Sequence, residues 1–141
     1  MLVLICGCRR WANYRCKTCN TSVWPCVNCA VTNKRMRDAI RLELFAHNLK
    51  PGIDTIIHGG AKGADSIAGE TAQALGFKVV EFPANWSQYG KGAGPKRNQE
   101  MLNQKPDLVL AFHPDLSRSK GTKHMVEIAR KAGVPVEVFD K

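Results

Sequence analysis

A glycine-rich segment runs from His58 to Asp65 and reads His-Gly-Gly-Ala-Lys-Gly-Ala-Asp. Glycine permits backbone conformations and a close approach to a ligand that a Cβ atom would prevent. A helix that begins in this segment would direct free N–H groups and a partial positive charge at an anion. The segment therefore predicts a phosphate-binding turn between a strand and a helix, although the same glycines could serve only the geometry of a tight turn.

Four cysteines form two C-x-x-C pairs, Cys16 with Cys19 and Cys26 with Cys29. Each pair can place two sulfurs on one knuckle, and two knuckles can surround one tetrahedral zinc ion. Four thiolates leave no open coordination position, so we expect a structural Zn²⁺ rather than a catalytic one. Redox-active pairs and free thiols are the alternatives. Cys6 is expected to pack within a strand.

Strand-sized apolar runs alternate with helical segments along the chain. The expected strands are residues 2–6, 53–57, 78–82, 107–112 and 134–139. The expected helices are residues 33–48 with Thr32 as N-cap, 62–75, a segment from Gly94 to Pro106, and 121–132. This order predicts an α/β, Rossmann-like three-layer domain with a five-stranded, mostly parallel sheet. We expect a single domain over residues 1–141, with a zinc-binding insertion at 12–30 after the first strand.

Ligands of open parallel sheets bind where the carboxyl ends of the strands meet the loops that follow them. An arginine side chain at this edge can bind a phosphate through two hydrogen bonds, and a tryptophan could stack on a base or simply pack at the rim. Gly121-Thr122 repeats the pattern of a glycine before a helix, with Thr122 as a second N-cap candidate. The predicted ligand-binding residues are Gly7, Cys8, Arg9, Trp11, His58, Gly59, Gly60, Ala61, Lys62, Gly63, Asp65, Asn85, Trp86, Arg97, Asn98, Gly121 and Thr122.

Three side chains are candidates for acid–base catalysis: His58, Asp65 and Glu127. A histidine at a strand end is also a common structural residue, and an aspartate in a first helical turn can cap the helix, or orient a ligand hydroxyl or the loop itself. The three do not form a clear pair of catalytic carboxylates.

The formal net charge of +9 is concentrated near the amino terminus, because residues 1–50 hold nine Lys or Arg against two acids. This excess predicts either a surface for the phosphates of a nucleotide or nucleic acid, or a solvated basic helix face. We expect a cytoplasmic protein, because we find neither a signal-peptide pattern nor an apolar run long enough to cross a membrane.

Several motifs in fixed order resemble the YspA-type branch of the SLOG superfamily, which is frequent in bacteria and phages. They are Gly7-Cys8-Arg9 with Trp11, the segment 58–65, Pro83-Ala84-Asn85-Trp86, Gly94-Pro95-x-Arg97-Asn98-x-x-Met101, the strand 107–112, and Gly121-Thr122. The resemblance implies a Rossmann-like fold and a nucleotide-derived ligand. SLOG proteins are related to cytokinin-activating phosphoribohydrolases and to the DNA-processing protein DprA.

The chain departs from these relatives at three places. Position 8 is Cys where the family usually has a small hydroxyl residue, and the cysteine-rich insertion follows the first strand. The phosphoribohydrolases carry a glutamate three residues beyond their Gly-Thr pair, whereas this chain has Met125 there and Glu127 two residues further on. Transfer of their hydrolase activity is therefore not supported.

These observations favour a protein that binds a nucleotide or a nucleotide-derived small molecule, as a sensor or by sequestering it. The first alternative is a hydrolase that cleaves an N-glycosidic or phosphate bond at the same site. The second is a single-stranded nucleic-acid-binding protein, which the basic amino-terminal third and the zinc segment suggest. No membrane partner is expected, and the chain could form a homo-oligomer.

Overall fold

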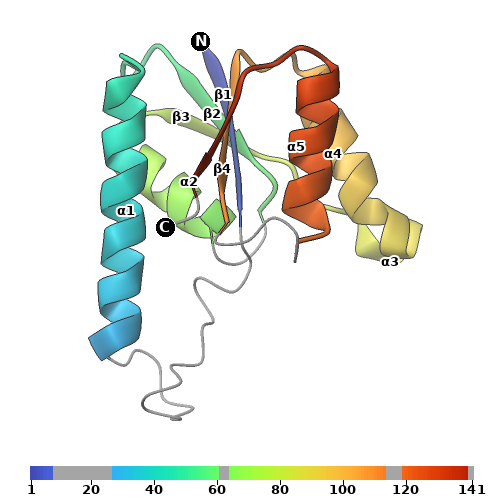
Figure 1. Cartoon of the computed structure of the whole chain (residues 1–141), viewed down its shortest axis with the longest axis horizontal. Coiled ribbons are helices and arrows are strands. Elements are labelled where there is room, and N and C mark those ends of the chain that lie inside the picture. The colour runs from blue at the N-terminus through green and yellow to red at the C-terminus, as the bar shows by residue number, and fades with distance from the viewer. Residues whose placement is uncertain (8–26, 61–63, 114–118, 140–141) are drawn as a thin grey trace.

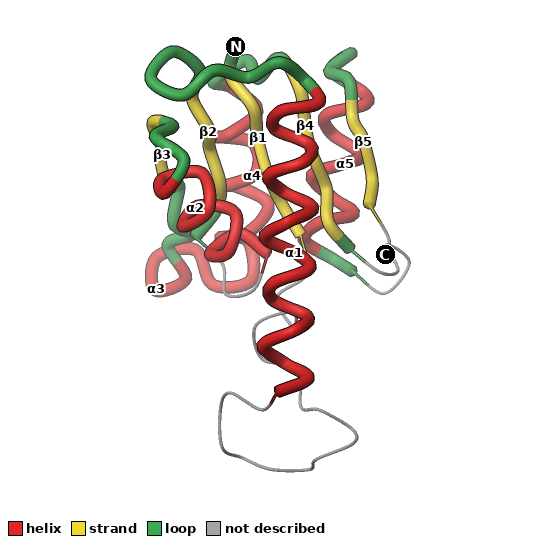
Figure 2. The backbone as a smooth tube through the Cα atoms, turned by 90° about the vertical axis from the view of Figure 1, so that its left-hand side faces the viewer, coloured by secondary structure: helices red, strands yellow, loops and turns green. Residues whose placement is uncertain are grey.

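The computed structural model describes residues 1–7, 27–60, 64–113 and 119–139. Its centre is a five-stranded sheet in which every neighbouring pair is parallel, with the order β3-β2-β1-β4-β5 (Figure 2). The strands are β1 (Leu2–Gly7), β2 (Thr55–His58), β3 (Lys78–Glu81), β4 (Leu108–Phe112) and β5 (Val136–Phe139). The predicted α/β class, the Rossmann-like layering and the five strands are confirmed.

Helices cover both faces of the sheet (Figure 1). One face carries α1 (Val27–Ala46) and α2 (Ala64–Ala74), and the other carries α4 (Ala93–Asn103) and α5 (Gly121–Lys131). A short helix, α3 (Trp86–Tyr89), and the 3-10 turn η2 (Gly90–Gly92) lie between β3 and α4. The alternation of strand and helix along the chain therefore yields three layers.

Each strand contributes side chains to two separate cores, because successive side chains point to opposite faces of a sheet. In β1, Val3 and Ile5 pack against the α1–α2 layer, whereas Leu4 and Cys6 pack against the α4–α5 layer. Of these, Val3, Leu4 and Ile5 are fully buried. A central strand buried on both faces is an unbroken apolar run, which explains why β1 and β4 were easy to predict.

Several predicted boundaries differ from the structure, and two of the differences have a clear local cause. Helix α1 begins at Val27 rather than after Thr32, since residues 27–46 contain neither proline nor glycine and Thr32 lies within the helix. Strand β2 begins at Thr55, because the Asp54 carboxylate accepts the Lys50 N–H at 2.6 Å and keeps residues 50–54 in a turn. Residues 12–26 of the predicted insertion lie outside the described residues, and residues 27–30 form the first turn of α1.

The strand order reverses direction between β1 and β4. After β1 the chain proceeds outward to β2 and β3, then returns to place β4 on the other side of β1. Gly7 pairs with Phe112 in register where these two strands end. Such a reversal opens a crevice at the carboxyl ends of the strands, which we call the carboxyl edge. Among the helices described, none has the length and apolar character needed to span a membrane.

Candidate functional site

The loop that leaves β2 at the carboxyl edge, here called the glycine turn (residues 58–65), is held by its own side chains. The Gly59 N–H donates to Asp65 Oδ2 at 3.1 Å, and the Gly60 N–H donates to His58 Nδ1 at 3.0 Å. Asp65 lies in the first turn of α2 and is buried, so of its predicted roles the structure shows orientation of the loop. The N–H groups of Gly59 and Gly60 are therefore both bonded within the turn itself.

Arg97 of α4 holds the same turn from the other face of the sheet. Its Nη1 donates to the Gly59 carbonyl at 2.6 Å and its Nε donates to Asn98 Oδ1 at 3.0 Å, while only 8% of the residue is exposed. A Cβ on residue 59 would stand 2.6 Å from the guanidinium carbon. Glycine is therefore required at position 59 because a buried guanidinium occupies the space of a side chain.

Glu81 is a site residue that the sequence analysis missed. Gly60 has a φ of +70°, and a Cβ there would stand 2.7 Å from the Glu81 carboxyl carbon. Glu81 is the last residue of β3 and pairs in register with His58, the last residue of β2. The strands predicted from the sequence end at Ile57 and Phe82, one residue before and one residue after the observed ends, so aligning them would not have paired Glu81 with His58.

The His58 ring is enclosed between the glycine turn and α2. Its Nδ1 accepts the Gly60 N–H, and its Nε2 lies 2.6 Å from where a Cβ on Gly69 would stand. The pKa of His58 lies below its ordinary 6.5, chiefly because of burial; the Glu81 carboxylate opposes the shift and Arg97 adds to it. Such a ring is neutral at neutral pH, which is the state that can accept the Gly60 N–H.

We expect the protein to lose stability as the pH falls below 6.5, and the His58→Asn variant to lose less. The unfolded chain gains a proton on His58 near its ordinary pKa, whereas the folded chain gains it only at lower pH. The contribution of the neutral ring is thus fully present above pH 6.5 and is lost as the pH falls through the lowered pKa. Asparagine can accept the Gly60 N–H but does not titrate. Urea unfolding of both proteins between pH 8 and pH 5 measures the difference.

A direct control for this prediction is an NMR titration of the His58 ring. Its midpoint should lie below 6.5 in the folded protein. Parallel stability curves for wild type and His58→Asn, together with an unshifted ring, would show that the turn does not depend on a neutral histidine.

A second loop at the carboxyl edge is joined to the first through Asn98. Its Nδ2 donates to the Gly121 carbonyl at 3.2 Å and lies 3.1 Å from His124 Nδ1, at the start of α5. Thr122 is buried inside the first turn of α5 and is not its N-cap, because the helix begins at Gly121 and Lys120 is the N-cap residue; the Thr122 N–H donates to Ser119 Oγ at 3.0 Å. Adjacent residues of α4 therefore hold the loops that follow β2 and β4.

The end of β1 lies within the same electrostatic environment. Cys6 is a free, buried thiol, as predicted, and its pKa is raised strongly by burial and further by the Asp65 carboxylate, while Arg97 opposes the shift. Cys6 thus stays protonated. Gly7 follows it as the last residue of β1.

The loop after β3 forms the outer part of this region. Asn85 caps α3, with its Oδ1 accepting the Gln88 N–H at 3.1 Å. Trp86 is 49% exposed, and its ring tip lies against Gly94 at the start of α4. A hollow of about 230 Å³ lies between α3 and α4, lined by Pro83, Asn85, Gln88, Tyr89, Ala93, Lys96, Arg97 and Glu100. Arg97 therefore contributes both to this hollow and to the glycine turn.

Other predicted residues do not join this region or lie outside the described residues. Glu127 is exposed on α5 with its carboxylate 4.0 Å from Lys123 Nζ, so the three catalytic candidates do not converge. The predicted residues outside the described ranges are Cys8, Arg9, Trp11, Cys16, Cys19, Cys26, Ala61, Lys62 and Gly63. Cys29 falls in the first turn of α1.

Comparison with known proteins identifies relatives of this chain. The family model described as the YspA, cpYpsA-related SLOG family matches residues 1–89. The chain is also similar to the Gene 61 protein of Mycobacterium phage D29, with 39% identity over 142 residues, covering 97% of this chain and 94% of that protein. No solved structure matches the chain. The chain belongs to the YspA, cpYpsA-related SLOG family.

Proposed function

We propose that this protein binds a nucleotide or a nucleotide-derived small molecule at the carboxyl edge of its sheet, as a sensor or by sequestering the molecule. Membership of the SLOG family suggests a nucleotide-related function. One structural observation carries the proposal: the glycine turn is held by buried polar side chains from two different helices, Asp65 of α2 and Arg97 of α4.

A turn that only joined β2 to α2 would need glycines, but it would not need a buried arginine from α4. Burying a guanidinium is costly unless it is well hydrogen-bonded, so its placement on the Gly59 carbonyl indicates that the exact shape of this turn matters. A backbone fixed before the ligand arrives binds with less loss of conformational entropy. The amino end of α2 follows directly, and its helix dipole favours an anion such as phosphate.

The proposal assigns different tasks to the predicted ligand-binding residues. The phosphate would lie near the amino end of α2, with Lys62 and Arg9 as cationic partners. The half-exposed ring of Trp86 offers a stacking surface for a base. Arg97 would act through the turn rather than on the phosphate, because its Nη1 and Nε are bonded to Gly59 and Asn98. The two C-x-x-C pairs remain proposed ligands of a structural zinc ion.

Isothermal titration calorimetry with phosphate, AMP, ADP and ADP-ribose tests the proposal on wild type and two lysine variants. Lys62→Ala should weaken binding by roughly 10-fold or more, the size expected for losing a hydrogen bond between charged groups. Lys78→Ala is the matched control, because Lys78 is exposed at the amino end of β3, at the opposite edge of the sheet. The affinity of Lys78→Ala for each compound should equal that of the wild type.

The outcomes separate the alternatives. Absence of heat for every compound with the folded protein would refute the proposal. Products found by chromatography after incubation would instead indicate the hydrolase. Tight binding of a short single-stranded oligonucleotide that falls steeply with added salt, without binding of any nucleotide, would indicate the nucleic-acid-binding alternative.

A further inference from the structure

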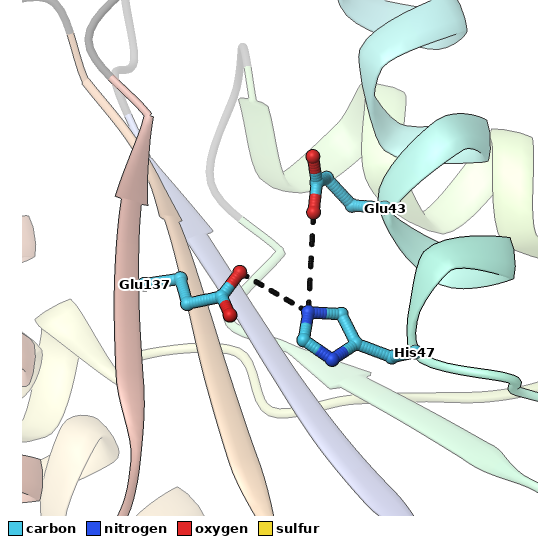
Figure 3. Close-up of side chains that lie close together, drawn as sticks. All are labelled: Glu43, His47 and Glu137. Carbon is cyan, nitrogen blue, oxygen red and sulfur yellow. Dashed lines mark hydrogen bonds and ion pairs between the residues drawn. The ribbon is translucent and has the colours of Figure 1, made fainter.

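Glu43, His47 and Glu137 converge on one point of the α1-covered face of the sheet (Figure 3). His47 Nε2 lies 3.1 Å from Glu137 Oε2 and 3.9 Å from Glu43 Oε2. One donor atom from each of the three residues falls within 4.8 Å of the other two. Two carboxylates are thus directed at a single imidazole nitrogen.

The fold brings these residues together from distant parts of the chain. Glu43 and His47 are four residues apart at the end of α1, so they share one side of that segment. Glu137 lies in the edge strand β5 between Val136 and Val138, which pack into the α4–α5 core, so its side chain points to the α1 face. This point lies toward the amino ends of the strands, since α1 returns the chain to the start of β2.

We propose that Glu43, His47 and Glu137 bind a divalent transition-metal ion of the zinc type. Zinc bonds of about 2.0–2.2 Å to nitrogen and oxygen place tetrahedral ligand atoms roughly 3.3–3.6 Å apart. The observed separations of 3.1 Å and 3.9 Å lie on either side of this range. Small side-chain movements would therefore complete a coordination shell.

The donor set favours zinc over the abundant alkaline-earth ions. Imidazole is a ligand for zinc, copper, iron and nickel, whereas Mg²⁺ and Ca²⁺ prefer oxygen ligands throughout. Two carboxylates neutralise the charge of a dication. The His47, Glu43 and Glu137 side chains are 25%, 22% and 44% exposed, so water can reach the ion as a fourth ligand.

The competing explanation is a surface ion pair in which a protonated His47 binds both glutamates. Such exposed pairs contribute little to stability. A metal ion would instead join the end of α1 to β5 by bonds that EDTA removes. The two explanations therefore differ in whether zinc binds and whether it stabilises the protein.

Equilibrium dialysis of the full chain against Zn²⁺, followed by elemental analysis, tests the proposal. Wild type should retain one equivalent of zinc more than His47→Gln or Glu137→Gln. Zinc held by cysteines is the same in all of these proteins and cancels in the difference. Glu70→Gln is the matched control, because Glu70 is an exposed carboxylate on α2, and it should retain the wild-type amount.

Two further measurements support the comparison. Co²⁺ in place of zinc should give a difference spectrum between wild type and His47→Gln without thiolate charge-transfer bands, because the ligands are nitrogen and oxygen. Added Zn²⁺ should raise the Tm of wild type and Glu70→Gln more than that of Glu137→Gln, whose substitution lies on an edge strand and should leave the fold intact. Equal zinc content in wild type, His47→Gln and Glu137→Gln would overturn the proposal, whatever the nucleotide titrations show.

Discussion

Gly59→Ala is expected to lower the free energy of unfolding by about 2–4 kcal/mol and to abolish nucleotide binding. The new Cβ would stand 2.6 Å from the guanidinium carbon of Arg97, which is buried and cannot move aside freely. The hydrogen bond from Arg97 to the Gly59 carbonyl would break, and the glycine turn would lose its shape. Urea unfolding followed by circular dichroism measures the stability, and calorimetry measures the binding.

Gly92→Ala is the matched control for this substitution. Gly92 has a φ of −80°, and within the described part of the chain a Cβ there meets no atom within 4 Å. We expect the free energy of unfolding of Gly92→Ala to stay within about 0.5 kcal/mol of the wild type, and its nucleotide binding to be unaltered. If Gly59→Ala were as stable as Gly92→Ala, the close approach of Arg97 to residue 59 would not be a constraint on the fold.

Arg97→Met is expected to lower the free energy of unfolding by about 3 kcal/mol. The substitution removes the donor from the buried Gly59 carbonyl and from the Asn98 side-chain oxygen. The pKa of His58 should rise toward its ordinary value, since the guanidinium is one of the causes that lower it. Urea unfolding and an NMR titration of His58 measure the two effects. Lys96→Met is the control: its ammonium lies 3.7 Å from the centroid of the exposed Tyr89 ring and should contribute less than about 1 kcal/mol.

The double variant Gly59→Ala/Arg97→Met distinguishes a shared contact from two separate defects. Residues in direct contact have non-additive effects on stability, and methionine can adapt its shape to the new Cβ. The double variant should therefore be little less stable than either single variant. Additive losses would mean that Arg97 stabilises the protein through other contacts.

The sequence predicted the sheet because its strands have an unmistakable composition. Residues 2–6 and 108–112 are apolar without alternation, as strands buried on both faces must be, and helical segments separate all five runs. The boundaries were harder to predict. Thr32 looks like an N-cap, but α1 begins at Val27, and Ile53 looks like part of a strand, although it is 73% exposed in the turn formed by Asp54.

The carboxyl edge of the sheet was also predictable, since it follows from the order of strands and helices. The interactions that the residues gathered at this edge make could not be predicted from the sequence. Arg97 looks like a phosphate ligand in the sequence, yet one of its partners is a main-chain carbonyl 38 residues away, and no side-chain pattern reveals that. Asn98 likewise binds the main-chain carbonyl of Gly121, 23 residues away, and Asp65 accepts the Gly59 N–H within its own turn. Local sequence thus singled out residues that meet at this edge of the sheet, but not what each of them holds.

The glycine turn also links the folding of the protein to its proposed binding of a ligand. Asp65 belongs to a helix of one layer and Arg97 to a helix of the opposite layer, and both bind the main chain of Gly59 between them. A folding intermediate in which a single layer had docked on the sheet would have an incomplete turn. In the proposed function, the ligand would therefore be bound only once both helical layers have docked on the sheet, and a chain in which one layer is undocked would not withdraw nucleotide from its surroundings.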